Sequence, residues 1–236
     1  MSTIGPSSFS YSSASTSLYS SNTSVSAEPK IYPPERYRAL SCLAVGAGAG
    51  GSVNMLAKVT VVDYWGNEMM EAFVRPTEPV VDYRTAHTGI TEENLDSPQA
   101  LPFDVVQAKV TDLISGYIII GHTLWNDLSV LGICHLAINT RDIALYLPFR
   151  KAIKQEGTPG LPTLVWIFMG SIISYFAFVV WIFMGRYIHC GTSDSTENAR
   201  ACMDLFRSTE HNWEQSALNG NWPCALPPVG YARYFH

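Results

Sequence analysis

The sequence contains few basic residues and no closely spaced cysteine pairs. Its 15 lysines and arginines are outnumbered by 20 aspartates and glutamates, which gives a net charge of −5 and a pI near 5.6. This charge argues against a broadly basic nucleic-acid-binding protein and leaves room for a local basic patch. Without CxxC or metal-finger spacing, the thiols are expected to be reduced and mostly buried, in an intracellular compartment. The five cysteines are Cys42, Cys134, Cys190, Cys202 and Cys224.

The N-terminal segment lacks both charge and long apolar runs. Residues 1–30 are dominated by serine and threonine, and no charged side chain precedes Glu28. Such a segment buries too little apolar surface to offset the entropy lost on ordering, so we expect a disordered tail over residues 1–33. The apolar stretch of a secretory signal and the arginines of a mitochondrial transit peptide are both missing.

The next part of the chain predicts strands followed by alternating helices and strands. Residues 39–45 form a continuous apolar run typical of a buried strand, and two further strands are expected at 56–64 and 71–74. Helical spacing or start signals predict helices at 104–115, 127–136 and 197–210, with a buried strand at 117–120. This order indicates an α/β or α+β domain over residues 34–215. A loosely packed tail rich in proline, glycine and aromatic residues is expected at 216–236.

A glycine-rich hexapeptide resembles a dinucleotide-binding fingerprint. Gly46-Ala47-Gly48-Ala49-Gly50-Gly51 fits the G-x-G-x-x-G pattern after a strand. That motif requires a following helix whose N-terminus receives the pyrophosphate. The next residues alternate like a strand, so a hairpin loop is the better interpretation and no nucleotide cofactor is expected.

Residues 164–185 form an uncharged apolar run that is long enough to span a bilayer, for which about 20 residues suffice. Within it, the hexapeptide Val-Trp-Ile-Phe-Met-Gly occurs at residues 165–170 and again at 180–185. The repeat indicates a local duplication, an insertion or an error in the gene model. A membrane-spanning or partner-binding helix and a buried core helix are the alternatives.

Several short motifs, taken in order and spacing, resemble those of the DEDDh-type 3′–5′ exonucleases. The similarity is greatest to fungal RNA exonucleases of the ribosomal-RNA-processing type and to the interferon-stimulated RNA exonuclease. Removing fifteen residues from the repeat region restores the family's spacing between Thr158-Pro159 and Glu197, which favours the insertion hypothesis. The motifs are Asp82-Tyr83-Arg84-Thr85, Gly89-Ile90, Gly121-His122, Asn126-Asp127-Leu128, Arg141-Asp142 with Tyr146, Arg150-Lys151, Thr158-Pro159 with Leu161, and Glu197-Asn198-Ala199-Arg200-Ala201.

The resemblance implies an RNase H-like fold, with a mixed five-stranded sheet flanked by helices, and a two-metal active site. Two divalent cations about 3.5–4 Å apart clamp the attacking and leaving oxygens of a phosphodiester. Mg²⁺ and Mn²⁺ prefer carboxylate oxygens, which the family supplies from an Asp-x-Glu strand and two further aspartates. A histidine serves as the general base.

Carried over position by position, the resemblance leaves one of the five catalytic groups in place. Asp127 matches the aspartate of the family's second motif. It is the one predicted catalytic and metal-binding residue. The other four positions fall on Ser41, Leu43, Ser193 and Asn198. A leucine side chain cannot coordinate a metal, and a serine does not act as a general base near neutral pH. We therefore expect that metal-dependent hydrolysis is lost and that no cofactor is bound.

One acid close to these positions could act as a substitute. Asp194 lies beside Ser193 and could enter the site if its loop slipped, but nothing replaces the two strand acids. Asp127 could instead be an acid at a helix start, where it interacts with free N–H groups and the helix dipole. His122 is more typical of a structural histidine than of a base.

Basic residues persist at family positions near the expected substrate cleft. Arg84, Arg141, Arg150 and Lys151 could contact phosphates and are the predicted substrate-binding residues. For Arg84 and Arg141 the alternative is a hydrogen-bonding role that supports the fold. RNA binding without metals is expected to be weak, because the neutralising cations form part of the affinity.

The leading hypothesis is a catalytically degenerate 3′–5′ RNA exonuclease homologue with a binding, regulatory or scaffolding role. Its partner would be RNA or another single-stranded nucleic acid, and any protein partner is unknown. The alternatives are an active exoribonuclease using Mg²⁺ or Mn²⁺ and a membrane-tethered interaction protein, which requires residues 164–185 to be a genuine spanning helix. The resemblance implies an intracellular, nuclear location.

Overall fold

The structure, a computed structural model, describes residues 31–154, 157–170 and 192–236. Most of the N-terminal tail predicted over residues 1–33 lies outside these ranges, as does the second copy of the repeated hexapeptide. The first copy belongs largely to a helix, α6 (Leu161–Phe168). No helix among the described residues combines the length and the apolar character needed to cross a membrane.

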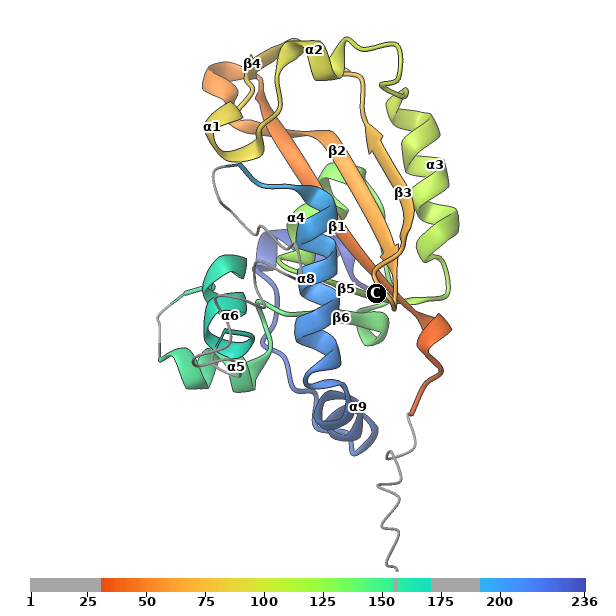
Figure 1. The fold of residues 1–236 in the computed structure, drawn as a ribbon, viewed down its shortest axis with the longest axis vertical. Helices are drawn as coiled ribbons and strands as arrows, with labels where there is room; N and C mark the ends of the chain where they lie inside the picture. The colour runs from red at the N-terminus through yellow and green to blue at the C-terminus, as the bar shows by residue number, and fades with distance from the viewer. Residues whose placement is uncertain (1–30, 155–156, 171–191) are drawn as a thin grey trace, which may run out of the picture.

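A mixed six-stranded sheet forms the centre of the fold (Figure 1). Five strands follow the order β3-β2-β1-β5-β6, in agreement with the predicted five-stranded sheet, and β4 adds a short antiparallel pairing to the end of β1. The first three strands are antiparallel, whereas β5 and β6 are parallel to β1. The strands are β1 (Tyr37–Ala47), β2 (Val53–Asp63), β3 (Glu68–Phe73), β4 (Val80–Asp82), β5 (Ile118–Gly121) and β6 (Thr140–Asp142).

Helices cover both faces of this sheet and give three layers. On one face, α5, α6, α8 and α9 pack with apolar side chains from β1, β2 and β5. On the other face, α3 and α4 pack against the same three strands. The helices are α1 (Thr85–Thr88), α2 (Glu92–Leu95), α3 (Phe103–Ile114), α4 (Leu124–Leu131), α5 (Leu147–Ile153), α6 (Leu161–Phe168), α8 (Ser195–Arg207) and α9 (Glu210–Leu218).

Two predicted helices have different bounds in the structure. The helix expected at 127–136 begins at Leu124 and ends at Leu131, because Gly132 adopts a left-handed conformation with φ 64° that terminates it. The helix expected at 197–210 is α8, which stops at Arg207 and is followed by the separate helix α9. Both differences concern helix ends, which depend on capping contacts more than on apolar spacing.

The glycine-rich hexapeptide is a loop between two antiparallel strands, as predicted. Gly46 pairs with Asn54 and Ala47 with Val53 across the hairpin. A Cβ atom at Gly46 would lie 2.5 Å from the carbonyl oxygen of Gly51, so the close approach requires glycine. Because β2 follows in place of a helix, the loop lacks the helix N-terminus that a dinucleotide phosphate would need.

The C-terminal segment, expected to be a loosely packed extension, is mostly exposed or half-buried but contacts the domain at several points. The N–H of His135 donates to the carbonyl of Tyr234 at 2.9 Å, and the N–H of Ala225 donates to the carbonyl of Leu145 at 2.9 Å. Phe235 also packs against the cluster formed by Trp125, Ala144 and Leu145. These pairings join segments far apart in the sequence, so the composition of the tail does not reveal them.

Candidate active-site pocket

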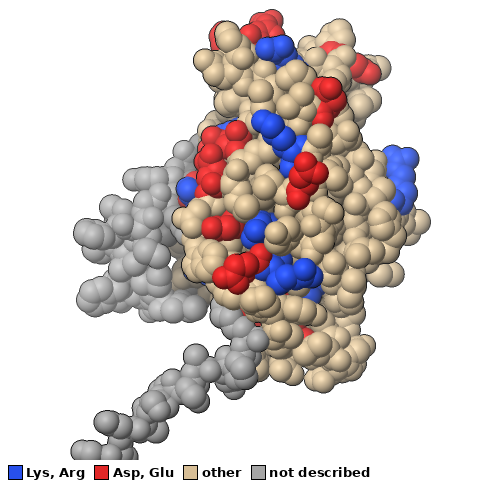
Figure 2. All heavy atoms as spheres, turned by 90° about the vertical axis from the view of Figure 1, so that its right-hand side faces the viewer, with Lys and Arg blue, Asp and Glu red and all other residues tan. Residues whose placement is uncertain are grey.

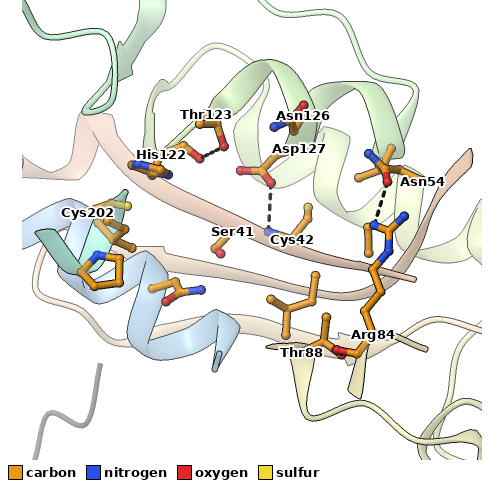
Figure 3. Close-up of a pocket in the computed structure, with 16 residues that line it drawn as sticks. Ser41, Cys42, Asn54, Arg84, Thr88, His122, Thr123, Asn126, Asp127 and Cys202 are labelled. Atoms are coloured by element: carbon orange, nitrogen blue, oxygen red, sulfur yellow. Dashed lines mark hydrogen bonds between the residues drawn. The ribbon is translucent and has the colours of Figure 1, made fainter. Parts of the chain in front are cut away.

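A cavity of about 400 Å³ opens where β1, α4 and α8 meet, beside the segment that leads into α1 (Figure 3). Its size lies within the range of small-molecule sites in proteins, roughly 300–1,000 Å³. Polar and apolar side chains from both faces of the domain contribute to its walls. The lining residues are Ser41, Cys42, Leu43, Ala44, Asn54, Arg84, Thr88, His122, Thr123, Asn126, Asp127, Val130, Leu161, Pro162, Asn198 and Cys202.

Four of the five residues at predicted catalytic positions line this cavity. Ser41 and Leu43 come from β1, Asp127 from α4 and Asn198 from the first turn of α8. Ser193 is not among the lining residues, and its N–H donates to the carbonyl of His87 at 2.7 Å. The fold therefore brings together segments more than 150 residues apart in the sequence, as the motif order predicted.

Asp127 is buried, with 7 % of its surface exposed, and it contacts the central strand. The N–H of Cys42 donates to its Oδ1 at 3.3 Å (Figure 3). Burial raises the pKa of Asp127 well above its ordinary range; the N–H of Cys42 opposes this shift and the charge of Asp142 adds to it. The alternative, an acid at a helix start, predicted hydrogen bonds to the free N–H groups of its own helix. Asp127 lies in the first turn of α4, but its hydrogen bond comes from the N–H of Cys42 on β1.

Asp142, at the end of β6, is the acid that caps α4. Its carboxylate accepts hydrogen bonds from the N–H groups of Leu124 at 2.7 Å and Thr123 at 3.1 Å. Burial raises the pKa of Asp142 to about 7, although these N–H groups favour the charged form. The capping contact also explains why α4 begins at Leu124, three residues before the predicted start.

His122 lines the cavity but has a structural partner. Its Nε2 lies 2.7 Å from the carbonyl oxygen of Pro159, so this ring nitrogen donates a hydrogen bond to the backbone. The contact joins the end of β5 to the segment before α6. This geometry agrees with the interpretation of His122 as a structural histidine.

Asp194 is not among the residues that line the cavity and is held by three contacts. Its carboxylate accepts the N–H groups of Thr196 at 2.8 Å and Glu197 at 3.0 Å, which caps α8, and lies 3.6 Å from the Nζ of Lys58. Burial opposes ionisation, but the Glu197 N–H and the Lys58 ammonium outweigh it and lower the pKa of Asp194. Lys58 also forms an ion pair with Glu71 at 2.7 Å. Asp194 therefore does not take the place of the missing base.

Arg84 lies at the mouth of the cavity in a strained conformation. Its φ of 51° is in the left-handed region, as is the φ of 59° at Thr123 on the opposite wall. These are two of the three non-glycine residues with positive φ among the described residues, and such strain often occurs at functional sites. The Nη1 of Arg84 donates to Asn54 Oδ1 at 2.8 Å and its Nη2 donates to the carbonyl of Gly51 at 3.0 Å.

The predicted phosphate contact of Arg141 is contradicted by its burial. Arg141 is 2 % exposed and forms a bidentate ion pair with Glu214, with both N–O distances 2.8 Å. Its Nη1 donates to the carbonyls of Ile138 and Thr140. Arg141 thus supports the fold, which was the alternative role, because its donors already have protein partners.

The other predicted substrate-binding residues, Arg150 and Lys151, lie in the last turn of α5 and are not among the residues that line the cavity. Lys151 is exposed and Arg150 is half-buried. On the face shown in Figure 2, lysine and arginine side chains are interspersed with acidic ones. Of the four predicted substrate-binding residues, Arg84 is therefore the one that lines the cavity.

Sequence reasoning missed two further parts of the cavity. Asn54, at the start of β2, and Cys202, on α8, both line it, although neither belongs to a motif that marks a site. Cys42, which lies on β1 between Ser41 and Leu43, lines the cavity as well. Burial raises the pKa of both thiols, Cys42 and Cys202, well above the ordinary value for cysteine. Because the thiolate is the nucleophilic form, neither cysteine is an activated nucleophile.

The donor set of the cavity does not fit two magnesium or manganese ions. Asp127 supplies the one carboxylate among the described lining residues, and its burial disfavours the charged form that a metal would need. His122 already donates to the backbone, and Leu43 places an apolar group where the family has a bridging glutamate. Across the part of the chain that the structure describes, no three His, Cys, Asp or Glu side chains converge to hold a metal.

The mixed sheet covered by helices on both faces is consistent with an RNase H-like fold. No family model matches the sequence. Individual proteins do: the chain is 36 % identical over 189 residues to RNA exonuclease 4 of Mus musculus, covering 80 % of this chain and 40 % of that protein. It is 32 % identical over 191 residues to the apoptosis-enhancing nuclease of Homo sapiens, covering 81 % and 55 %.

The fold is also similar to a solved nuclease domain. The Saccharomyces cerevisiae PAN2 pseudoubiquitin-hydrolase-RNase module superposes with a TM-score of 0.59 at 20 % identity, over 87 % of this chain and 34 % of that one. In sequence the chain is therefore similar to these nucleases, and in fold it is similar to the PAN2 module. It spans about half or less of the length of the two relatives named above.

Proposed function

We propose that this chain is a catalytically degenerate 3′–5′ RNA exonuclease homologue, a pseudo-nuclease that retains a binding role. The observation that supports this most directly is the chemistry of the cavity. Ser41, Leu43 and Asn198 occupy the family's acid positions and line the same cavity as Asp127. A two-metal mechanism requires several anionic oxygens at once, and this cavity supplies one buried carboxyl.

The missing general base alone is a large loss. A positioned acid or base contributes about 10²–10⁴-fold to a hydrolytic rate. Ser193 stands at that position, and the neighbouring Asp194 is engaged with the α8 N-terminus and Lys58. Because the ligands for both metals are missing as well, we expect no measurable phosphodiester hydrolysis.

RNA is the binding partner that the family relationship favours. The relatives named above are RNA exonuclease 4 and a nuclease, and a solved neighbour of the same fold is a Pan2 module in complex with AAUUAA RNA. An intracellular, nuclear location is proposed on the same basis. The membrane-tethered alternative depends on residues 164–185, of which the structure describes only residues 164–170, and carbonate extraction of membranes tests it.

A nuclease assay with RNA labelled at its 5′ end tests the proposal. The purified full chain is incubated with Mg²⁺ or Mn²⁺ and compared with Asp127→Ala. We expect equal, background-level trimming from both proteins. Metal-dependent trimming by the wild type that disappears in Asp127→Ala would instead establish the alternative, an active exoribonuclease using a rearranged site.

A restored variant serves as the positive control. Ser41→Asp, Leu43→Glu and Asn198→Asp return the family's acids to the cavity, and Ser193→His restores the histidine at the position expected for the general base. Trimming by this quadruple variant under conditions where the wild type is inactive would show that the substitutions, and not the assay, account for the lack of turnover. Circular dichroism and the urea midpoint of each variant establish that it is folded.

A further inference from the structure

A hollow of about 170 Å³ lies at the start of β2, at the end of the sheet where β4, α1 and α2 are found (Figure 1). Four successive residues of the strand, Val53–Leu56, line it. Successive side chains of a strand point to opposite faces, so a cavity on one face would be lined by alternate residues. The hollow therefore lies along the edge of β2. The other lining residues are Ala47, Arg75, Thr77, Glu78, Phe103 and Val130.

The apolar clusters on the two faces of the sheet agree with this position. Met55 packs against the cluster that includes Leu95 of α2, and the hydroxyl of Thr77 donates to its Sδ at 3.6 Å. Leu56 belongs to the cluster on the opposite face, against which Phe103 of α3 also packs. The hollow is thus bounded by the segment after β3 on one side and by α3 on the other, with the strand edge between them.

The backbone along this edge has no strand beside it. β3 pairs with residues 58–62 of β2, and the N–H of Val74 donates to the carbonyl of Ala57 at 2.9 Å. Among the described residues, no backbone group bonds to the outer edge of Val53–Leu56. Its N–H and C=O groups are therefore available to an added strand.

The outer edge of β3, by contrast, has features that oppose pairing with another chain. Glu68 and Glu71 are exposed on it, and Met69 is an extra residue that forms a β-bulge. Charges and bulges are the usual protection of an edge strand. The segment Val53–Leu56 has no charged side chain, pairs regularly with β1, and leaves 54 % of Val53 exposed. It is the less protected of the two edges.

Two opposite charges line the hollow. Arg75 and Glu78 are both exposed, and neither forms an ion pair with another described residue. They are three positions apart, so their Cα atoms are separated by at most about 11 Å. They suit an acid and a base of a peptide at a similar separation, whereas Glu78 would repel the phosphates of a nucleic acid.

The volume and the apolar part of the lining suit one side chain. Met55, Phe103 and Val130 supply apolar surface. A cavity of about 150 Å³ lined by such groups holds one benzene molecule, so this hollow is large enough for a single aliphatic side chain.

We propose that this edge binds an extended peptide of a partner protein, which adds a strand beside Val53–Leu56 and places one aliphatic side chain in the hollow. Main-chain hydrogen bonds to β2 supply the affinity, while the hollow and the two charges select the sequence. The inference does not depend on the proposed function, because none of the predicted catalytic positions lines the hollow.

Fluorescence anisotropy with a labelled peptide and the purified full chain tests the inference. The probe is Thr-Val-Glu-Thr-Leu-Lys-Val-Thr, in which valine and threonine favour an extended chain and leucine is the anchor. Its acid and base are three positions apart, and a second probe with these two exchanged covers the opposite strand direction. We expect one of the two probes to bind with a dissociation constant below about 1 mM.

Altered probes separate the backbone contribution from that of the anchor. Methylation of alternate backbone nitrogens, in each of the two possible registers, removes donors and keeps the side chains. The register that faces β2 should bind at least about tenfold more weakly than the parent probe. Replacing the leucine of the probe by alanine should also weaken binding about tenfold, because the apolar burial in the hollow is lost.

Arg75→Glu tests the charge contact, with Arg36→Glu as its matched control. Both arginines are exposed, and Arg36 precedes β1 at the end opposite the hollow, about 35 Å away for an 11-residue strand. Arg75→Glu should weaken binding about tenfold, and a probe with lysine in place of its glutamate should restore it. Arg36→Glu should change neither result. Urea midpoints establish that both variants are folded.

Hydrogen exchange followed by mass spectrometry locates the added strand. Amides within residues 53–56 should exchange more slowly when the probe is bound. Those within residues 58–62 should not change, because β3 already pairs with them. Slower exchange at 53–56 as the protein concentration rises, without peptide, would show that a second copy of the chain covers the edge and would overturn the inference.

The inference also fails if neither probe binds below about 1 mM, if both methylated probes bind as well as the parent, or if Arg75→Glu and Arg36→Glu have equal effects. Displacement of the bound probe by a single-stranded RNA ten-mer would assign the hollow to nucleic acid instead. Metal-dependent shortening of RNA concerns the larger cavity, so it bears on the proposed function alone.

Discussion

Replacing Arg141 by methionine distinguishes a structural role from an RNA-binding role at a position where the sequence allowed both. The guanidinium donates through Nε and Nη2 to the two carboxylate oxygens of Glu214, and both side chains are 2 % exposed. The methionine fills similar space but leaves the Glu214 carboxylate buried without a partner. Removing one member of a buried ion pair costs about 3–5 kcal/mol of unfolding free energy.

This cost is large enough to measure in the full chain. For a domain of 150–250 residues, each kcal/mol lowers the melting temperature by about 2–4 °C, so Arg141→Met should lower it by about 6–20 °C. Urea unfolding followed by tryptophan fluorescence provides the second measurement. Trp213 stacks on Tyr146 at 4.1 Å and Trp222 lies 5.3 Å from the Arg141 guanidinium, so the signal reports on this region.

A double variant completes the test. In Arg141→Met/Glu214→Leu both charges are removed, so most of the lost stability should return. About 1–3 kcal/mol should stay missing, because the carbonyls of Ile138 and Thr140 lose their donor. The affinity of the folded single variant for RNA should equal that of the wild type. An unchanged urea midpoint combined with a tenfold loss of RNA affinity would refute the structural role.

Two further predictions concern the acids that cap helices. Asp194→Ala removes the α8 cap and should cost about 1–2 kcal/mol, whereas Asp104→Ala, an exposed first-turn acid of α3 with no capping bond, should stay within about 0.5 kcal/mol. For Asp142, with a pKa of about 7, the folded protein retains a proton that the unfolded chain loses above about pH 4. This group should therefore lower stability as pH rises from about 4 to 7, by up to ~1.4 kcal/mol per unit. Urea midpoints across this range should fall more steeply in the wild type than in Asp142→Asn, which keeps only the contribution of buried Asp127; equal slopes would contradict it.

The strands of the sheet were predictable where the chain alternates or is continuously apolar over several residues. The runs at 39–45, 56–64 and 117–120 fall on β1, β2 and β5 apart from Tyr64 and Tyr117 at their ends, because burial selects apolar residues at the period of a strand. β4 and β6 contain three residues each, which is too short for any period to be recognised. They form because longer neighbours, β1 and β5, offer free edges for pairing.

The position of the site was also predictable, although its contacts were not. The order of the motifs placed Ser41, Leu43, Asp127 and Asn198 together, and the structure gathers all four around one cavity. Nothing in the sequence indicated Asn54, since an asparagine at the start of a strand has no distinguishing neighbours. Its role depends on Arg84, which lies 30 residues further along the chain.

The sequence alone determined the layers of this fold and the loss of acids from its central strand, because apolar periodicity and residue identity are local properties. Tertiary structure decided which partner each polar group has. It placed Arg141 against Glu214, Asp142 at the start of α4 and Asp194 at the start of α8. Buried polar groups must find partners wherever the folded chain brings donors and acceptors together, and no spacing in the sequence encodes that distance.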